Sequence, residues 1–224
     1  MGDRGRMRYT GRVNVDVFSD VICPWCFVGK RRLERALKMR PGLKTRVRWR
    51  PFQLNPDMPP EGSDREAYLV AKFGSAGQTR QVYEAVAEAG EAEGIGFAFD
   101  RIKRTPNTLN AHRLIRFAAE AGTQERVVEL LFRRYFEEGG DVGDPDLLAE
   151  TGAEAGLDAG AVRAHLASGD GIEAVRAEDA LARRMGITGV PCFIVDGRYA
   201  IAGAHAPEVL LRLFDLGDRP AVAP

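Results

Sequence analysis

Residues 13–26 read VNVDVFSDVICPWC, and this stretch decides how the chain begins to fold. Its valines alternate with other side chains at the two-residue period of a β-strand. Helical spacing follows at once, because Cys26, Leu33 and Ala36 share one face of a helix that ends at Pro41-Gly42. A second strand pattern covers residues 46–52. The chain therefore opens as strand, helix and strand, the unit that builds a sheet with parallel neighbours.

The middle of the chain has a different character, with abundant alanine, glutamate and arginine and almost no strand pattern. The helices predicted there are Asp64–Lys72, Gly77–Glu93, Thr108–Ala121, Gln124–Glu137, Pro145–Ala155 and Ala159–Ser168. A helix over Glu173–Met185 precedes a hairpin whose strands flank Asp196-Gly197, and a last helix covers Pro207–Leu216. We predict an α/β fold in which residues 1–55 and 171–224 form one β/α domain and residues 56–170 form an inserted all-helical domain.

Charge and hydropathy exclude several classes of protein. Lys plus Arg and Asp plus Glu both total 32, so no net charge attracts the chain to nucleic acid or to an anionic membrane. No run approaches the roughly 20 apolar residues of a membrane-spanning helix. The basic start is not followed by an apolar run of signal-peptide length, so a cytoplasmic location is the expectation.

The chain has three cysteines, at positions 23, 26 and 192, which is too sparse a set for a disulfide framework. Cys23 falls where the first strand meets the helix, and the unpaired backbone N–H groups of a helix N-terminus favour a thiolate there. Pro24 suits the first helical turn. Cys26 is near enough to attack a mixed disulfide formed on Cys23. The pattern therefore predicts a nucleophilic and a resolving cysteine.

Two other readings of the cysteine pair remain, half of a zinc site or inert buried thiols. A closed zinc site needs four ligands, and the chain has no second Cys-x-x-Cys to complete one. The remaining candidate ligands are Cys192 and three scattered histidines, His112, His165 and His205. We predict no metal site.

Four motifs together resemble the DsbA-like branch of the thioredoxin superfamily, and most closely its FrnE-type subfamily. They are SDVICPWC at 19–26, RPFQLNP at 50–56, NTLNAHR at 107–113 and GVPCF at 189–193. The resemblance extends from about Val13 to Leu216 and includes the inserted helices. It implies a thioredoxin-like fold with an inserted all-helical domain, and the activity of a thiol–disulfide oxidoreductase.

The resemblance also implies roles for residues around the cysteines. Val190-Pro191 is expected to be a cis peptide that faces the pair, with the backbone of Val190 pairing with an extended substrate. Asp16 falls near the buried acid of DsbA-like proteins and is a candidate acceptor for the proton of Cys26; an edge-exposed aspartate is the alternative. Trp25 replaces the histidine between the cysteines of DsbA, which predicts a less oxidising centre.

Three further positions are candidates for supporting roles. In FrnE-like relatives the segment that contains Asn107 and His112 overhangs the cysteines, so both are candidate substrate contacts, although a packing or solvated histidine is the alternative for His112. Cys192 departs from the apolar residue usual in the family. As the next residue of a strand after Pro191, it is expected to point away from the site as a small buried side chain, with redox involvement as the alternative.

The leading hypothesis is a cytoplasmic reductase or isomerase of protein or small-molecule disulfides, regenerated by a cellular thiol. No tightly bound cofactor is implied, and glutathione is a candidate co-substrate. The inserted-helix architecture also resembles 2-hydroxychromene-2-carboxylate isomerases and kappa-class glutathione transferases, which typically have a serine where this chain has Cys23. A third hypothesis is a holdase-like binding protein without turnover. A monomer and a homodimer both remain open.

Overall fold

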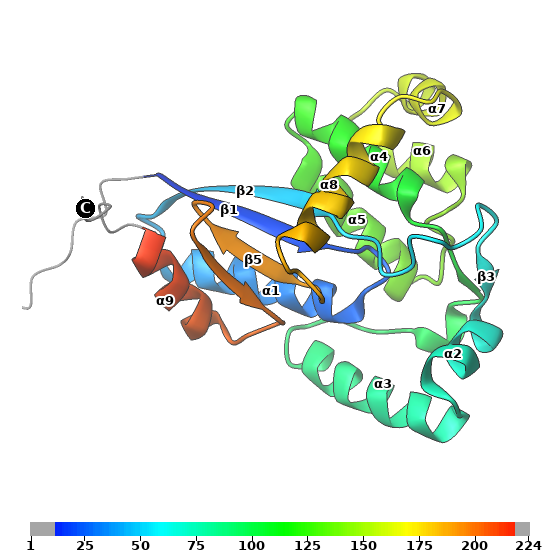
Figure 1. The fold of residues 1–224 in the computed structure, drawn as a ribbon, viewed down its shortest axis with the longest axis horizontal. Coiled ribbons are helices and arrows are strands. Elements are labelled where there is room, and N and C mark those ends of the chain that lie inside the picture. The colour runs from blue at the N-terminus through cyan, green and yellow to red at the C-terminus, as the bar shows by residue number, and fades with distance from the viewer. Residues whose placement is uncertain (1–11, 218–224) are drawn as a thin grey trace, which may run out of the picture.

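A four-stranded sheet with strand order β2-β1-β5-β6 forms the centre of the computed structural model, which describes residues 12–217 (Figure 1). β1 (Arg12–Ser19) and β2 (Lys44–Pro51) are parallel and are joined by α1 (Pro24–Met39). β5 (Cys192–Val195) comes from the far end of the chain and pairs with β1 in antiparallel orientation, followed by β6 (Tyr199–Ala202). The predicted α/β fold and its parallel opening unit are confirmed.

The hairpin between β5 and β6 has the turn that its sequence predicts. Asp196 and Gly197 both have positive φ angles, 50° and 67°, as a two-residue hairpin turn of the primed type requires. The Asp196 carboxylate also accepts hydrogen bonds from the backbone and side-chain N–H groups of Asn14, at 2.9 and 3.0 Å. The turn is therefore fastened to β1.

The two faces of the sheet are covered by different helices (Figure 1). The buried valines of β1 pack in one core with α1 and with α9 (Pro207–Gly217). On the opposite face, α8 (Ile172–Arg184) packs over the sheet through a smaller apolar cluster. That cluster consists of Phe18, Phe52, Ala182, Ile187, Cys192 and Ile194.

Every predicted helix of the inserted region is present, with ends within two residues of the predicted ones. These helices are α2 (Arg65–Phe73), α3 (Ala76–Glu91), α4 (Leu109–Glu120), α5 (Gln124–Phe136), α6 (Pro145–Glu154) and α7 (Ala159–Ala167). No helix between residues 12 and 217 is long and apolar enough to cross a bilayer.

The inserted region is not all-helical, which corrects the prediction. β3 (Ser63–Asp64) and β4 (Arg104–Thr105) form a short antiparallel ladder, and a 3₁₀ turn, η1, covers Phe99–Arg101. Strands of two residues are too short to show the alternation by which a strand is recognised in sequence. The buried Arg65 holds this corner together, because its guanidinium donates to Thr105 Oγ1 at 3.1 Å and to the hydroxyl of Tyr135 at 3.3 Å.

A single aromatic core crosses from the β/α part into the inserted helices. Phe27 of α1 stacks on Phe132 of α5 with ring centroids 5.1 Å apart, and meets Phe97 edge to face at 6.1 Å. Packing is therefore continuous at Phe27 across the predicted boundary between the two domains, one formed by residues 1–55 and 171–224 and the other by residues 56–170. The boundaries themselves stay a prediction.

An ion-pair network joins α1 to α5. The buried Lys30 ammonium lies 2.7 Å from Glu125 and 3.0 Å from Glu129, and Arg31 contacts Glu129 at 2.6 Å. Burial alone would raise the pKa of Glu129, but hydrogen bonds from Arg31 and the charge of Lys30 outweigh it and lower this pKa to about 2. The network holds the helix that carries both cysteines against the inserted region.

Close contact also fixes the start of β5 on α1. A Cβ atom on Gly29 would lie 2.8 Å from Pro191 Cγ and 3.3 Å from Phe193 Cζ. Only glycine allows this approach, since the proline ring cannot swing aside. The Val190-Pro191 bond is cis, as the resemblance implies, and the Pro191 carbonyl accepts from the backbone of Gly203 at 2.7 Å.

Glu129→Gln should destabilise the fold by about 2 kcal/mol at pH 7, because it leaves the buried Lys30 and the partly buried Arg31 with fewer counter-charges. The pKa of Glu129 in the fold is about 2 against an ordinary 4.5, so its stabilising effect is complete above pH 4.5 and is lost as the pH falls toward 2. Urea denaturation at several pH values should show the difference between wild type and variant shrinking below pH 4.5. A pH-independent difference would contradict this account; the exposed Glu173→Gln serves as the control.

Gly29→Ala should lower the free energy of unfolding by about 1–2 kcal/mol. Overpacking against Pro191 typically costs about 1–3 kcal/mol and exceeds the gain in helix propensity, about 1 kcal/mol. The matched control is Gly77→Ala in α3, where the added Cβ would meet only Ser75 Oγ, at 4.0 Å. Chemical denaturation of both variants measures the effect, and equal stabilities would refute the steric argument.

Candidate functional site

Cys23 occupies the N-cap position of α1, where the strand-to-helix turn aims its side chain at the helix end. Its backbone is extended, with φ −92° and ψ 111°, and Pro24 begins the helix. The Cys23 carbonyl accepts from the backbone N–H of Cys26 at 3.0 Å. No side chain caps this end of the helix, and the partial positive charge of the helix N-terminus lies next to Cys23.

Cys26 is held one turn further in, as a free thiol next to the free thiol of Cys23. Cys23 retains 5% of its surface exposure and Cys26 retains none. Burial raises the pKa of Cys26, and its contact with Cys23 raises it further; the Ser19 hydroxyl and the Asp20 backbone N–H oppose this shift through hydrogen bonds. The two sulfurs thus differ in access to water, and the enclosed Cys26 thiol has a raised pKa.

The predicted partners of the pair are in place. Cys23 Sγ donates to the carbonyl oxygen of Val190 at 3.6 Å, and the cis Pro191 follows directly. The structure therefore brings Cys23 and Cys26 together with Val190 and Pro191, although more than 160 residues of chain separate the two pairs.

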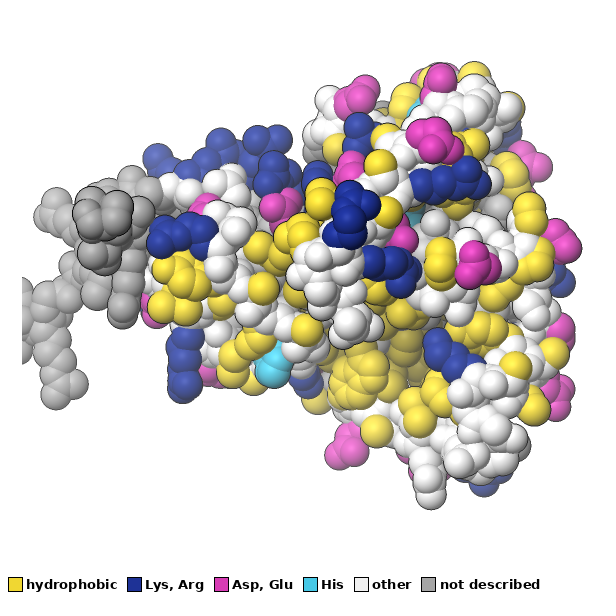
Figure 2. Space-filling view, viewed as in Figure 1, with side chains coloured by type: hydrophobic (Ala, Val, Ile, Leu, Met, Phe, Trp, Pro, Cys, Tyr) yellow, Lys and Arg dark blue, Asp and Glu magenta, His cyan; other side chains and the backbone are white. Residues whose placement is uncertain are grey.

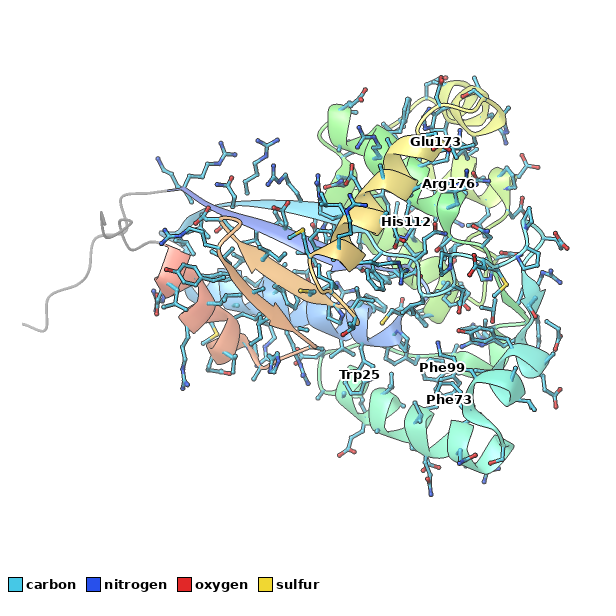
Figure 3. All side chains as sticks on the ribbon, viewed as in Figure 1. Trp25, Phe73, Phe99, His112, Glu173 and Arg176 are labelled. Carbon is cyan, nitrogen blue, oxygen red and sulfur yellow. The ribbon has the colours of Figure 1, made fainter. Side chains whose placement is uncertain are left out.

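The surface around the cysteines is largely apolar. Trp25 is 36% exposed and lies between the start of α1 and α3 (Figure 3). In Figure 2, apolar side chains gather in the hollow between the body of the molecule and the α2–α3 pair. A groove of about 570 Å³ is lined by Leu54, Met58 and Tyr68, and Leu54 and Val190 both pack against the apolar cluster under α8.

Asp16 does not lie beside Cys26. Its side chain follows the alternation of β1 onto the α8 face, together with Phe18, whereas Cys26 packs with the valines of the other face. There Asp16 accepts two hydrogen bonds from Arg48, each 2.8 Å long.

The carboxylate at the site is that of Asp20, which the sequence analysis quoted in a motif but did not assign. Asp20 is completely buried in the loop between β1 and Cys23. Its carbonyl accepts from the Cys23 N–H at 3.0 Å, and its Oδ2 accepts from the Leu54 N–H at 2.7 Å. The available signal in the sequence was an acidic residue three positions before Cys23. Because Asp20 follows the end of the strand, no strand alternation indicates that its side chain is buried.

His112 and Asn107 have mainly internal contacts. His112 is 4% exposed, and its Nε2 lies 3.4 Å from Asp20 Oδ1 without the alignment of a hydrogen bond. Figure 3 shows it on α4, beside the end of the sheet. The Asn107 amide donates to the Met58 carbonyl at 2.5 Å and accepts from the Leu109 N–H at 2.9 Å, so it shapes the loop beside the groove. Their role as substrate contacts stays a prediction.

Cys192 points away from the pair, into the apolar cluster under α8, where burial raises its pKa. Within residues 12–217, no three His, Cys, Asp or Glu side chains gather in a way that could hold a metal ion.

Comparison with known proteins agrees with this geometry. A family model described as DSBA-like thioredoxin domain matches residues 14–215. A probable DsbA oxidoreductase of Streptomyces coelicolor is 33% identical, with a TM-score of 0.84 over 95% of this chain and 93% of that one. The uncharacterized protein YwbO of Bacillus subtilis is 28% identical over 198 residues, 88% of this chain and 93% of YwbO.

A more distant likeness concerns the fold alone. The cytosolic disulfide reductase DsbM of Pseudomonas aeruginosa, solved with GSH, is 22% identical, with a TM-score of 0.58 over 90% of this chain and 94% of that one. The matched family region includes both cysteines, Pro191 and the helical insertion. The thioredoxin-like fold with a helical insertion is thereby confirmed, while the FrnE subfamily stays a prediction. The chain belongs to the DSBA-like thioredoxin domain family of thiol oxidoreductases.

Proposed function

We propose that the protein is a thiol–disulfide oxidoreductase in which Cys23 attacks the substrate and Cys26 resolves the intermediate. The observation that carries this assignment is the difference between the two sulfurs. Cys23 lies at the helix N-terminus against the Val190 carbonyl, whereas Cys26 is fully buried behind it and burial raises its pKa. A nucleophile must be the more accessible of the two thiols, and a resolving thiol can be enclosed behind it.

The reaction balances as two successive exchanges. The Cys23 thiolate attacks one sulfur of a substrate disulfide, forming a mixed disulfide and releasing the first substrate thiolate. Cys26 then loses its proton, attacks Cys23 Sγ and releases the second substrate thiolate. The substrate gains two electrons and becomes two thiols, and the Cys23–Cys26 pair becomes a disulfide that a cellular thiol must reduce.

The substrate would approach along the apolar surface beside Val190. The Val190 carbonyl lies against Cys23 Sγ, and an extended peptide could pair with the Val190 backbone there. Trp25 and the groove beside Leu54 supply apolar surface for side chains on either side of the disulfide. These features favour a polypeptide substrate, and a small disulfide would use fewer of them.

Reduction or isomerisation in the cytoplasm is the direction that the site favours. Trp25 between the cysteines supplies no cationic imidazole to stabilise the Cys23 thiolate, which favours a less oxidising pair. Glutathione is the proposed co-substrate for regeneration, and no tightly bound cofactor is needed. The DsbM structure has a similar fold, is named a cytosolic disulfide reductase and was solved with GSH, which supports reduction as the direction and glutathione as the co-substrate.

The same geometry weighs against the two other hypotheses. A glutathione-dependent isomerase or transferase has no use for a resolving thiol, yet here Cys26 lies against Cys23. A holdase without turnover needs neither cysteine nor the Val190 carbonyl beside Cys23. The holdase hypothesis predicts that Cys23→Ser leaves the activity intact.

Reduction of insulin disulfides by dithiothreitol, followed by turbidity, tests the proposal. The wild type should accelerate the reaction, and Cys23→Ser should lose at least about 100-fold of this acceleration because the attacking thiolate is gone. Cys26→Ser should accumulate a mixed disulfide on Cys23, visible as added mass. Cys192→Ser is the matched control and should retain activity. Turnover that survives in Cys23→Ser would sink the proposal.

A further inference from the structure

A cleft of about 330 Å³ lies along the edge strand β2, between that strand and the helices α4, α5 and α8. It shares no lining residue with the groove beside Leu54. Its volume suits a small organic molecule, and much of its wall is apolar. The apolar lining residues are Val47, Trp49, Pro51, Ile115, Ala119 and Val175.

Arginine side chains collect in the same cleft. Arg46, Arg48 and Arg50 alternate along β2 and therefore project from one face of the strand, and Arg116 of α4 joins them. Figure 2 shows Lys and Arg side chains gathered along β2. Because the whole chain has no net charge, this is a local accumulation of positive charge.

Glu178 of α8 is the carboxylate that two of these arginines share. Its Oε1 accepts from Arg116, and its Oε2 lies 3.3 Å from Arg50 Nε. That nitrogen of Arg50 is buried and has no hydrogen bond in the described part of the chain. The Arg46 side chain has neither an ion pair nor a hydrogen bond between residues 12 and 217. Three guanidinium groups thus have one carboxylate among them.

The other charged groups of the lining are engaged with neighbours. Arg48 receives both oxygens of Asp16, each at 2.8 Å. Both oxygens of Glu125 are also taken, one by Lys30 at 2.7 Å and the other by the indole N–H of Trp49 at 2.6 Å. The donors left for a ligand are therefore those of Arg46, Arg50 and Arg116.

These donors suit one kind of ligand. A guanidinium group binds carboxylate and phosphate oxygens through paired N–H groups. The backbone adds a further donor, because the Trp49 N–H points across the open edge of β2 to Gln124, and the N–H of Val47, two residues earlier, faces the same side. The cations line a cleft bounded by α4 and α8, which favours a small molecule over a nucleic acid.

We propose that this cleft is a second binding site, and that it takes a small organic dianion, a phosphate ester or a dicarboxylate. Arg46, Arg50 and Arg116 hold the anionic groups, and the apolar wall covers the organic body. Two negative charges neutralise what Glu178 leaves uncompensated. The inference goes beyond the proposed function, because binding in this cleft uses neither cysteine.

The two tryptophans of the chain report on the two sites separately, since Trp49 lines the cleft and Trp25 lies between the cysteines. Heteronuclear NMR of the ¹⁵N-labelled protein gives one indole signal for each, and Trp25→Phe assigns them. The probe is phenyl phosphate at about pH 7.5, where a phosphate monoester is mostly dianionic. It should shift the Trp49 signal with a dissociation constant of about 1 mM or lower and leave the Trp25 signal in place. Phthalate is the dicarboxylate probe, and phenol is the uncharged control.

Substitutions at the cleft should change the affinity in opposite directions. Arg46→Gln and Arg116→Gln should each weaken binding of phenyl phosphate about 10-fold or more, because each removes a charge-assisted hydrogen bond. Glu178→Gln should tighten it about 3-fold or more, because the carboxylate that competes for Arg50 and Arg116 is gone. Damage to the fold would not produce this gain. The matched control is Arg176→Gln, since Arg176 is 61% exposed on α8 and pairs with Glu173 outside the cleft.

Saturable binding of phenyl phosphate or of phthalate supports the proposal and identifies the anionic group. The proposal is overturned if neither probe shifts the Trp49 signal at about 20 mM, or if phenol binds as tightly as they do. A response of the Trp25 signal in place of Trp49, or wild-type affinity in all three cleft variants, would overturn it as well. Cys23→Ser should bind phenyl phosphate as the wild type does, so failure of the insulin assay and failure of this proposal are separate results.

Discussion

The site depends on how closely the first turns of α1 approach the start of β5. Gly29 and Pro191 are in contact at a distance that no Cβ atom would permit, and this contact sets Val190 over the helix N-terminus. One sulfur then points at the Val190 carbonyl while the other is enclosed by the core. The asymmetry between Cys23 and Cys26 is thus a result of packing, since both residues belong to the same helical turn.

The same packing makes the enclosed Cys26 thiol harder to ionise. A thiol enclosed in an apolar core ionises with difficulty, because burial favours its neutral form. The polar groups that offset this effect lie where β1 ends, in the Ser19 hydroxyl and the Asp20 backbone N–H. The Asp20 carboxyl group is a buried polar group that an apolar core tolerates only with partners, and it has the Leu54 N–H on one oxygen and His112 near the other.

Much of the fold could be predicted because its elements carry clear periodicity and end signals. The valines of β1, the Pro24 start of α1 and the Asp196-Gly197 turn each determine local structure by themselves. β3 and β4 could not be predicted, since two residues have no period and their pairing depends on a contact 40 residues away. The redox role of the cysteine pair could be predicted from its two-residue spacing at the junction of strand and helix.

The buried acid was harder to identify from the sequence. Asp16 has the strand position expected by likeness to the family, but alternation sends its side chain to the other face and into contact with Arg48. Asp20 lies in the loop, where only the path of the chain decides burial. The nearness of Asp20 to His112 depends on how α4 docks on the sheet, which no local pattern encodes.

One side chain of α5 fixes how α4 and α5 dock on the sheet. Gln124 of α5 pairs with the edge of β2 as a strand would: its side-chain oxygen accepts from the Trp49 N–H at 3.0 Å, and its amide donates to the Trp49 carbonyl at 3.2 Å. The same amide donates to the Ile115 carbonyl of α4 at 3.3 Å. One side chain thereby fixes β2, α4 and α5 relative to each other, one helical turn from His112. The Gln124 side chain also occupies the N–H and C=O of Trp49 on the edge of β2, which would otherwise be open to pairing with another chain.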